Sequence, residues 1–150
     1  MSASHIIVEK SLLKSQAFKK LSGSGKYILF QFLMKRKFSE IGKGNWVCTN
    51  CQELVFTYKE AEKNHKYSAT KFLRAIDELI KHGFLSIPHH GGKTKGNYSL
   101  YALDGRWERF GKEDFEGFER EKIYNGRGFI EKQFPAHRND RQEQHIDTQK

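Results

Sequence analysis

The sequence has no apolar run long enough to cross a membrane. Its densest apolar stretch, Tyr27 to Met34, is interrupted by Gln31, whereas a membrane-spanning helix needs about 20 consecutive apolar residues. No basic segment followed by an apolar core and a small-residue cleavage site opens the chain, so we expect no export signal. These absences predict a cytoplasmic protein without a membrane partner.

Cysteine is scarce, because the 150 residues contain only Cys48 and Cys51. In a cytosolic chain we expect both to be thiols or metal ligands, and we expect no structural disulfide. Their spacing supplies half of a zinc site, but no second such pair follows, and His65, His89 and His90 lack the spacing of the missing ligands. Thioredoxin-like chemistry needs the pair at the start of a helix, and the surroundings are typical of strands. We therefore favour ordinary hairpin cysteines and predict no metal and no cofactor.

A recognisable catalytic motif is also absent. No Ser, Cys or Lys nucleophile has base and orienting partners nearby in the sequence. The run Gly92-Lys93-Thr94 resembles the end of a phosphate-binding loop, but Ile87 stands where such a loop needs its first glycine. Between residues 112 and 122, five carboxylates are interspersed with three cations and indicate a solvated face. We predict that the protein is not an enzyme and has no small-molecule ligand.

Positive charge is concentrated in one part of the chain. The net charge is +9, and residues 1–103 hold 17 of the 27 Lys and Arg residues but only 7 of the 18 Asp and Glu residues. Clustered cations favour a polyanionic partner, because their binding to nucleic acid releases condensed counterions. A charge that serves solubility alone remains the alternative.

Two helices and a short β segment are predicted in the first part of the chain. Apolar residues at spacings of four after a capping Ser11 indicate a short amphipathic helix. Ser24 can cap a second helix that ends near Lys37 and is apolar almost all round, so it should be the buried centre of the domain. After a glycine-rich loop, residues 46–49 and 54–57 are rich in β-forming side chains and predict a small hairpin or one extended strand.

Two further helices follow, joined by a short turn. Thr57 and Glu60 have the spacing of a capping box and begin a brief helix that ends near Asn64. Ser68 then caps the clearest helix of the sequence, which ends at Gly83. The apolar side chains of this helix share one face, and they are Phe72, Leu73, Ile76, Leu79 and Ile80.

The end of the regular pattern is a predicted hairpin. Residues 84–87 and 98–103 indicate two strands that a long, basic, glycine-rich loop connects. An irregular aromatic segment comes next, part of which we expect to pack on the domain, and a polar tail follows it. The expected divisions are an N-terminal helix and linker at 1–23, a domain at 24–103, a partly ordered appendage at 104–135 and a disordered tail at 136–150.

Two of these runs carry a resemblance to a known family. Residues Thr57–Ala61 and Ser68–Leu85 resemble the helix-turn-helix and the start of the wing in winged-helix regulators and mobile-element replication proteins of bacteria. The resemblance covers roughly residues 24–103, and its most specific part is the run Arg-x-Ile-x-Glu-Leu-Ile-x-x-Gly-Phe-Leu that begins at Arg74. It implies a mainly α fold with small β content (α+β): a winged helix-turn-helix with a three-helix core, a two-stranded wing and an extra N-terminal helix.

The helical period places a cationic surface on the second helix of the motif. Its outward side carries Lys71 and Arg74 in the N-terminal half, the half that enters the major groove in this family, and Asp77 and Glu78 toward the C-terminal end. An Arg74–Glu78 pair and a merely solvated wing tip are the plainer alternatives. The predicted DNA-binding residues are Lys66, Tyr67, Ser68, Thr70, Lys71, Arg74, Lys93, Thr94 and Lys95.

The sequence thus predicts a protein that binds double-stranded DNA and catalyses nothing. Transcriptional regulation is the first use that we expect. Replication or maintenance of a plasmid or phage is an alternative, since it uses the same module. A hypothesis from a different functional class is a winged helix that binds other proteins instead of DNA, through the aromatic segment from Trp107 to Phe134. We leave open whether the chain forms a homodimer.

Overall fold

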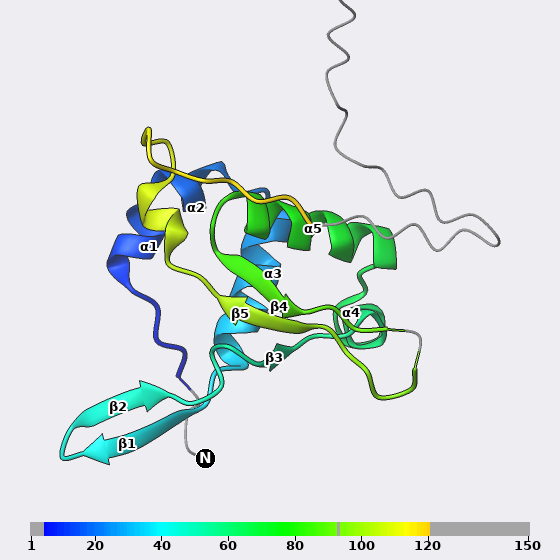
Figure 1. Ribbon diagram of the computed structural model, residues 1–150, viewed down its shortest axis with the longest axis horizontal. Coiled ribbons are helices and arrows are strands. Elements are labelled where there is room, and N and C mark those ends of the chain that lie inside the picture. The colour runs from blue at the N-terminus through cyan, green and yellow to red at the C-terminus, as the bar shows by residue number, and fades with distance from the viewer. Residues whose placement is uncertain (1–4, 93, 121–150) are drawn as a thin grey trace, which may run out of the picture. The chain divides into compact units, whose positions relative to one another are not determined.

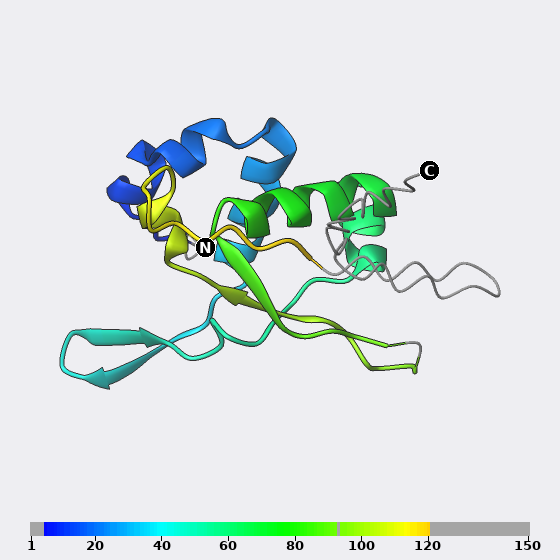
Figure 2. The same cartoon turned by 45° about the horizontal axis from the view of Figure 1, so that its top comes forward.

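The structure is a computed structural model that describes residues 5–92 and 94–120, all within one compact unit, Met1–Arg120 (Figures 1 and 2). Helices and two small antiparallel sheets make up this unit, so the predicted α+β class is confirmed. The tail predicted at 136–150 and the second half of the appendage lie outside the described residues. No helix in the described part is both long enough and apolar enough to span a bilayer.

Two short helices, α1 (Lys10–Lys14) and α2 (Gln16–Lys20), stand where one helix was predicted. Ser11 lies inside α1 and does not cap it. The break is at Ser15, whose hydroxyl donates to the carbonyl of Leu12 over 2.7 Å and accepts from the amide of Phe18 over 3.1 Å. The prediction was wrong because this serine ends one helix and caps the next, an alternative that serine offers to a backbone.

The central helix α3 (Gly23–Met34) is the buried centre of the domain, as predicted. Ile28 and Phe32 are wholly buried. The cap is Ser22 rather than Ser24, because the Ser22 hydroxyl accepts from the amide of Gly25. The helix also ends earlier than predicted. Asn50 accepts a hydrogen bond from the amide of Lys37 over 2.7 Å, so that amide is no longer available to extend the helix.

A β-hairpin that projects from the core follows α3, and we call residues 38–48 the arm (Figure 1). Strands β1 (Phe38–Gly42) and β2 (Asn45–Cys48) pair antiparallel, with Glu40 opposite Trp46. Residues 46–48 are therefore in a strand, but their partner is 38–42 and not 54–57. The sequence did not identify the first strand, because Gly42, which ends β1, and Gly44, which lies in the turn, were both assigned to the predicted loop.

The prediction of no disulfide is wrong, because Cys48 and Cys51 are bonded to each other. The chain turns after β2, and the two Cα atoms come within 5.8 Å, inside the range that disulfide bonds require. The bond therefore closes the base of the arm, where the arm joins the domain.

A second sheet has the order β3-β5-β4, with all neighbours antiparallel. Its strands are β3 (Leu54–Val55), β4 (Leu85–His89) and β5 (Leu100–Leu103). The long loop between β4 and β5 is the predicted one. Between β3 and β4 the chain forms α4 (Tyr58–His65) and α5 (Ala69–Lys81), both close to their predicted limits.

Local hydrogen bonds begin both of these helices as the sequence predicts. Thr57 caps α4 by accepting from the amide of Glu60, and Ser68 caps α5 by accepting from the amide of Lys71. Only half of the predicted capping box is formed, because the Glu60 carboxylate pairs with Lys35 of the chain segment after α3. That contact depends on the tertiary fold and has no local signal.

After β5 the chain packs back onto the domain. A 3₁₀ helix, η1 (Arg106–Arg109), places the Trp107 ring against Phe84, with centroids 5.9 Å apart and nearly parallel planes. The Trp107 amide donates to the carbonyl of Gly83 over 3.1 Å. Trp107 and Phe110 of the aromatic segment therefore extend the core, whereas Phe118 is exposed.

Candidate nucleic-acid interface

The turn between α4 and α5 is short and fixed by hydrogen bonds. Lys66 ends α4 in the left-handed region, with φ at 58°. The Lys66 and Tyr67 amides donate to carbonyls of the last turns of α4. The Tyr67 ring stacks on Tyr27 of α3, with centroids 5.5 Å apart and an angle of 8° between planes. The stack holds the start of α5 against α3, so Tyr67 is half-buried rather than free on the surface.

One face of α5 is exposed and cationic. Thr70, Lys71 and Arg74 are exposed, whereas Phe72 and Ile76 on the opposite face are wholly buried. The Lys71 ammonium lies 4.5 Å from the centroid of the Tyr67 ring, a cation–π contact that limits where this long side chain can go. The predicted residues of α5 therefore lie together on one exposed surface.

The two carboxylates on α5 are engaged by other parts of the chain. Arg120 donates to Asp77 through Nε over 2.7 Å and through Nη2 over 3.2 Å. Glu78 accepts from the backbone amide and the hydroxyl of Ser22, over 2.7 and 2.6 Å. The alternative in which Glu78 pairs with Arg74 is therefore wrong. The hydrogen bond to Asp77 also raises the pKa of Arg120 above its ordinary value.

The loop between β4 and β5 presents Thr94 and Lys95 to solvent, while Lys93 lies outside the described residues. Contacts within the loop shape it, since the Gly91 amide donates to the Ser99 hydroxyl over 2.9 Å. Together with the first turn of α4, the loop lines a groove of about 420 Å³. Side chains with a hydroxyl or ammonium group border the groove, and they are Thr57, Tyr58, Lys59, Thr94, Lys95, Tyr98, Ser99 and Tyr101.

The views agree on where these parts lie within the unit. The β4–β5 loop, α4 and the N-terminal end of α5 share one end, and the arm projects from the other (Figures 1 and 2). The predicted residues on α5 and on the loop thus belong to neighbouring segments, although they are more than 20 positions apart in the sequence. Of the nine predicted residues, Tyr67 departs most from the expectation, because it packs against Tyr27.

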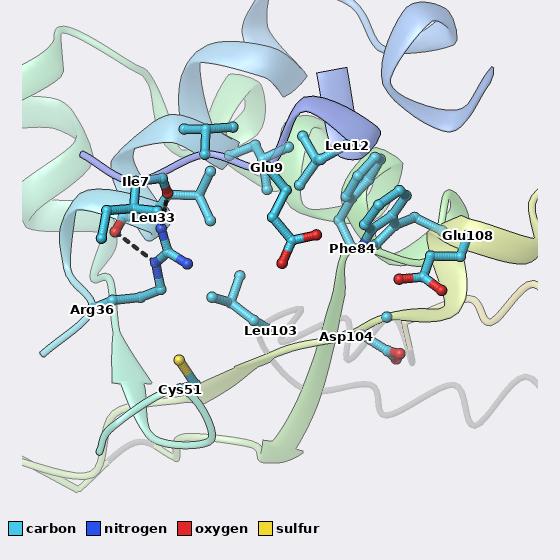
Figure 3. A pocket seen from close by; sticks show the side chains of 14 residues that line it. Ile7, Glu9, Leu12, Leu33, Arg36, Cys51, Phe84, Leu103, Asp104 and Glu108 are labelled. Atoms are coloured by element: carbon cyan, nitrogen blue, oxygen red, sulfur yellow. Dashed lines mark hydrogen bonds between the residues drawn. The ribbon is translucent and has the colours of Figure 1, made fainter. Parts of the chain in front are cut away.

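A second cavity, of about 320 Å³, lies between the N-terminal segment, α3 and β5 (Figure 3). Apolar side chains such as Leu12, Leu33 and Phe84 line it together with the charged side chains of Glu9, Arg36, Asp104 and Glu108, and none of the predicted residues line it. Arg36 enters it and donates to the carbonyls of Ile7 and Leu33, and burial lowers the pKa of Arg36. The Arg36 cation is therefore already bonded to backbone carbonyls within this cavity.

Metal ligation finds no support in the described part of the chain. It contains no group of three or more His, Cys, Asp or Glu residues placed to hold an ion.

Comparison of the chain with known protein families, with curated proteins and with solved structures found no match. The chemistry of the exposed surface must therefore carry the functional argument.

Sequence reasoning missed Arg120, which contacts α5 from 43 residues away. The helical period indicated that Asp77 faces outward, but nothing near it in the sequence indicated its partner. Tyr27 lies in the apolar stretch of the predicted second helix, but its stack with Tyr67 could not be inferred, because a contact between residues 40 positions apart leaves no local pattern.

Proposed function

We propose that the protein binds double-stranded DNA through a winged helix-turn-helix built from α3, β3, α4, α5, β4 and β5. Three helices, followed by a hairpin whose strands pair antiparallel, agree with the fold that the sequence resemblance implies. In this proposal α4 and α5 are the helix-turn-helix, and the β4–β5 loop is the wing.

One observation carries the proposal: the exposed cations of α5 face solvent at the end of the unit that also bears the β4–β5 loop, while the acids of α5 are turned to partners within the chain. Lys71 and Arg74 are exposed, and Asp77 and Glu78 accept hydrogen bonds from Arg120 and Ser22. A duplex presents one negative charge per roughly 1.7 Å of axis, so an uncompensated cationic surface is what it attracts.

The proposed docking puts the N-terminal half of α5 into the major groove. Thr70 and Arg74 would then face base edges, and Lys66 and Lys71 would face phosphates. The loop with Lys95 would lie over the adjacent backbone or minor groove. Tyr67 acts indirectly, because its ring supports the ammonium of Lys71. We propose transcriptional regulation as the use of this activity; replication or maintenance of a plasmid or phage would use the same surface.

Three of the four described aromatic residues of the segment that begins at Trp107 give the protein-docking alternative no support. Trp107 is buried against Phe84. Phe110 stacks on His82 with centroids 4.8 Å apart, and Phe115 packs against Phe110. These three rings are used within the domain, whereas Phe118 is 50% exposed and has the Arg106 guanidinium 4.3 Å from its ring centroid.

The experiment that tests the proposal compares two triple charge reversals with the same net charge. The first is Lys71→Glu, Arg74→Glu and Lys95→Glu on the proposed surface, and the second is Lys10→Glu, Lys14→Glu and Lys43→Glu on α1 and the arm. All six side chains are exposed, so both variants should keep their circular dichroism spectrum and melting temperature. Fluorescence anisotropy with a labelled random duplex measures the affinity.

We expect the first variant to lose about 100-fold or more in affinity, because each lost cation contact with DNA costs about 1 kcal/mol or more. The second should lose less than about 10-fold, through bulk charge alone. Equal losses in the two variants would reject a localised surface. Full affinity in the first variant would reject the proposal outright.

A further inference from the structure

Arg74 stands one helical turn before both acids of α5. Asp77 is three positions and Glu78 four positions after it, the two spacings at which side chains on a helix meet. An isolated helix of this sequence would offer the Arg74 guanidinium a carboxylate on either side. In the folded domain each acid has another partner, Arg120 for Asp77 and Ser22 for Glu78, and none of the ion pairs among the described residues involves Arg74.

Two features stabilise the Arg120–Asp77 ion pair. It uses two nitrogens of the guanidinium on two carboxylate oxygens, the two-pronged geometry that makes Arg–carboxylate pairs the strong ones. The Arg120 side chain is 17% exposed and that of Asp77 is 36% exposed, so water competes less with this pair than with a fully exposed one. An Arg74–Asp77 pair on the helix surface would have neither advantage.

We propose that Arg120 is a positioning residue for DNA binding: by holding Asp77, it keeps Arg74 available to the duplex. The inference depends on the proposed function, because it concerns how the Arg120–Asp77 ion pair keeps a cation of the proposed DNA-binding surface available. If Arg120 is removed, the Asp77 carboxylate loses its ion-pair partner and stands three positions from Arg74. The guanidinium of Arg74 is then held on the helix, and the duplex must break that pair before it can use the cation.

A purely structural role for Arg120 predicts a different result. Arg120 also fastens the segment after η1 to α5, so its loss could weaken binding by disturbing α5 itself. In that case the affinity would stay low whatever residue stands at 77, and the loss would not depend on Arg74. Substitutions at all three positions therefore separate the two roles.

The experiment measures duplex affinity by fluorescence anisotropy, at one low salt concentration, for five variants of the full chain. They are Arg120→Ala, Asp77→Asn, Arg120→Ala with Asp77→Asn, Arg74→Ala, and Arg74→Ala with Arg120→Ala. We expect Arg120→Ala to weaken binding about 3- to 10-fold, the size that one unscreened charge near several phosphates produces. Adding Asp77→Asn should restore affinity to within about 2-fold of the wild type, because the competing charge is gone.

The Arg74→Ala background supplies the decisive comparison. With Arg74 absent, Arg120→Ala should cause no further loss, because there is no guanidinium left to capture. The inference is overturned if Arg120→Ala binds like the wild type, if Asp77→Asn fails to rescue it, or if the loss is as large without Arg74. The proposed function fails separately, if the wild-type protein itself does not bind the duplex.

Discussion

At the scale of single residues, Gly83 sets the end of α5 and the start of the sheet. Its φ is +84°, in the left-handed region. A β-carbon there would lie 2.7 Å from the Trp107 amide nitrogen and 2.8 Å from the Arg106 carbonyl carbon. Both neighbours are backbone atoms and cannot rotate away. The position therefore combines a backbone preference with a close approach, and only glycine satisfies both.

Replacing Gly83 with alanine should consequently destabilise the domain by about 3 kcal/mol or more, since strain and overpacking add. The matched control is Gly44→Ala in the arm, where φ is +82° but no heavy atom lies within 4 Å of the added carbon. The control should cost only about 1 kcal/mol. Urea unfolding of both variants measures the difference, and equal free energies of unfolding would show that the η1 backbone does not pack against Gly83 as described.

At the scale of secondary-structure elements, the sequence predicts best where the signal is local. Ser68 and Thr57 cap their helices through amides three positions away, so residue type and spacing are sufficient. The apolar period of α5 identifies its buried face for the same reason. Local reasoning fails where a residue distant in the sequence determines a contact. The Glu60 carboxylate pairs with Lys35, and that contact leaves half of the capping box unformed.

The features of the candidate site also divide into those that local sequence predicts and those that depend on distant residues. The exposure of Lys71 and Arg74 follows from helical periodicity, and the loop with Lys95 follows from its composition. The engagement of Asp77 by Arg120 does not, because 43 residues separate them. The first strand of the arm was missed for a further reason. It covers no core, so it lacks the alternation of buried and exposed side chains by which a strand is recognised.

The arm should be dispensable for folding. All residues of β1 are exposed, as are Trp46 and Val47 of β2. At the base of the arm, the Thr49 amide donates to the Lys37 carbonyl over 2.8 Å. The two ends of the arm are therefore close enough for a short link to replace the whole hairpin. We expect a variant with Gly-Gly in place of residues 38–48, and with Cys51→Ser, to melt within about 4 °C of the wild type, as for changes confined to the surface.

The double variant Cys48→Ser and Cys51→Ser is its control, because it keeps the arm and removes only the disulfide. Calorimetry of the three proteins decides the matter. Loss of a cooperative unfolding transition in the armless variant, but not in the control, would show that the arm belongs to the folding core.

At the scale of the whole molecule, position rather than charge alone distinguishes the proposed surface, because α1 and the arm also carry exposed cations. The cations of α5 and of the β4–β5 loop lie at one end of the unit and the arm projects from the other (Figure 2). The arm also exposes large apolar side chains, with Ile41 at 71% and Trp46 at 61%. A duplex at the end that bears the β4–β5 loop would leave the arm uncovered.

The salt dependence of duplex binding tests the central claim most directly, because counterion release is the physical origin of the affinity that we propose. If about five cations reach phosphates, the logarithm of the association constant should fall against the logarithm of salt concentration with a slope of roughly −4 to −5. Raising the salt from about 50 to about 200 mM should then weaken binding roughly 500-fold. An affinity that stays constant over this range would contradict the account.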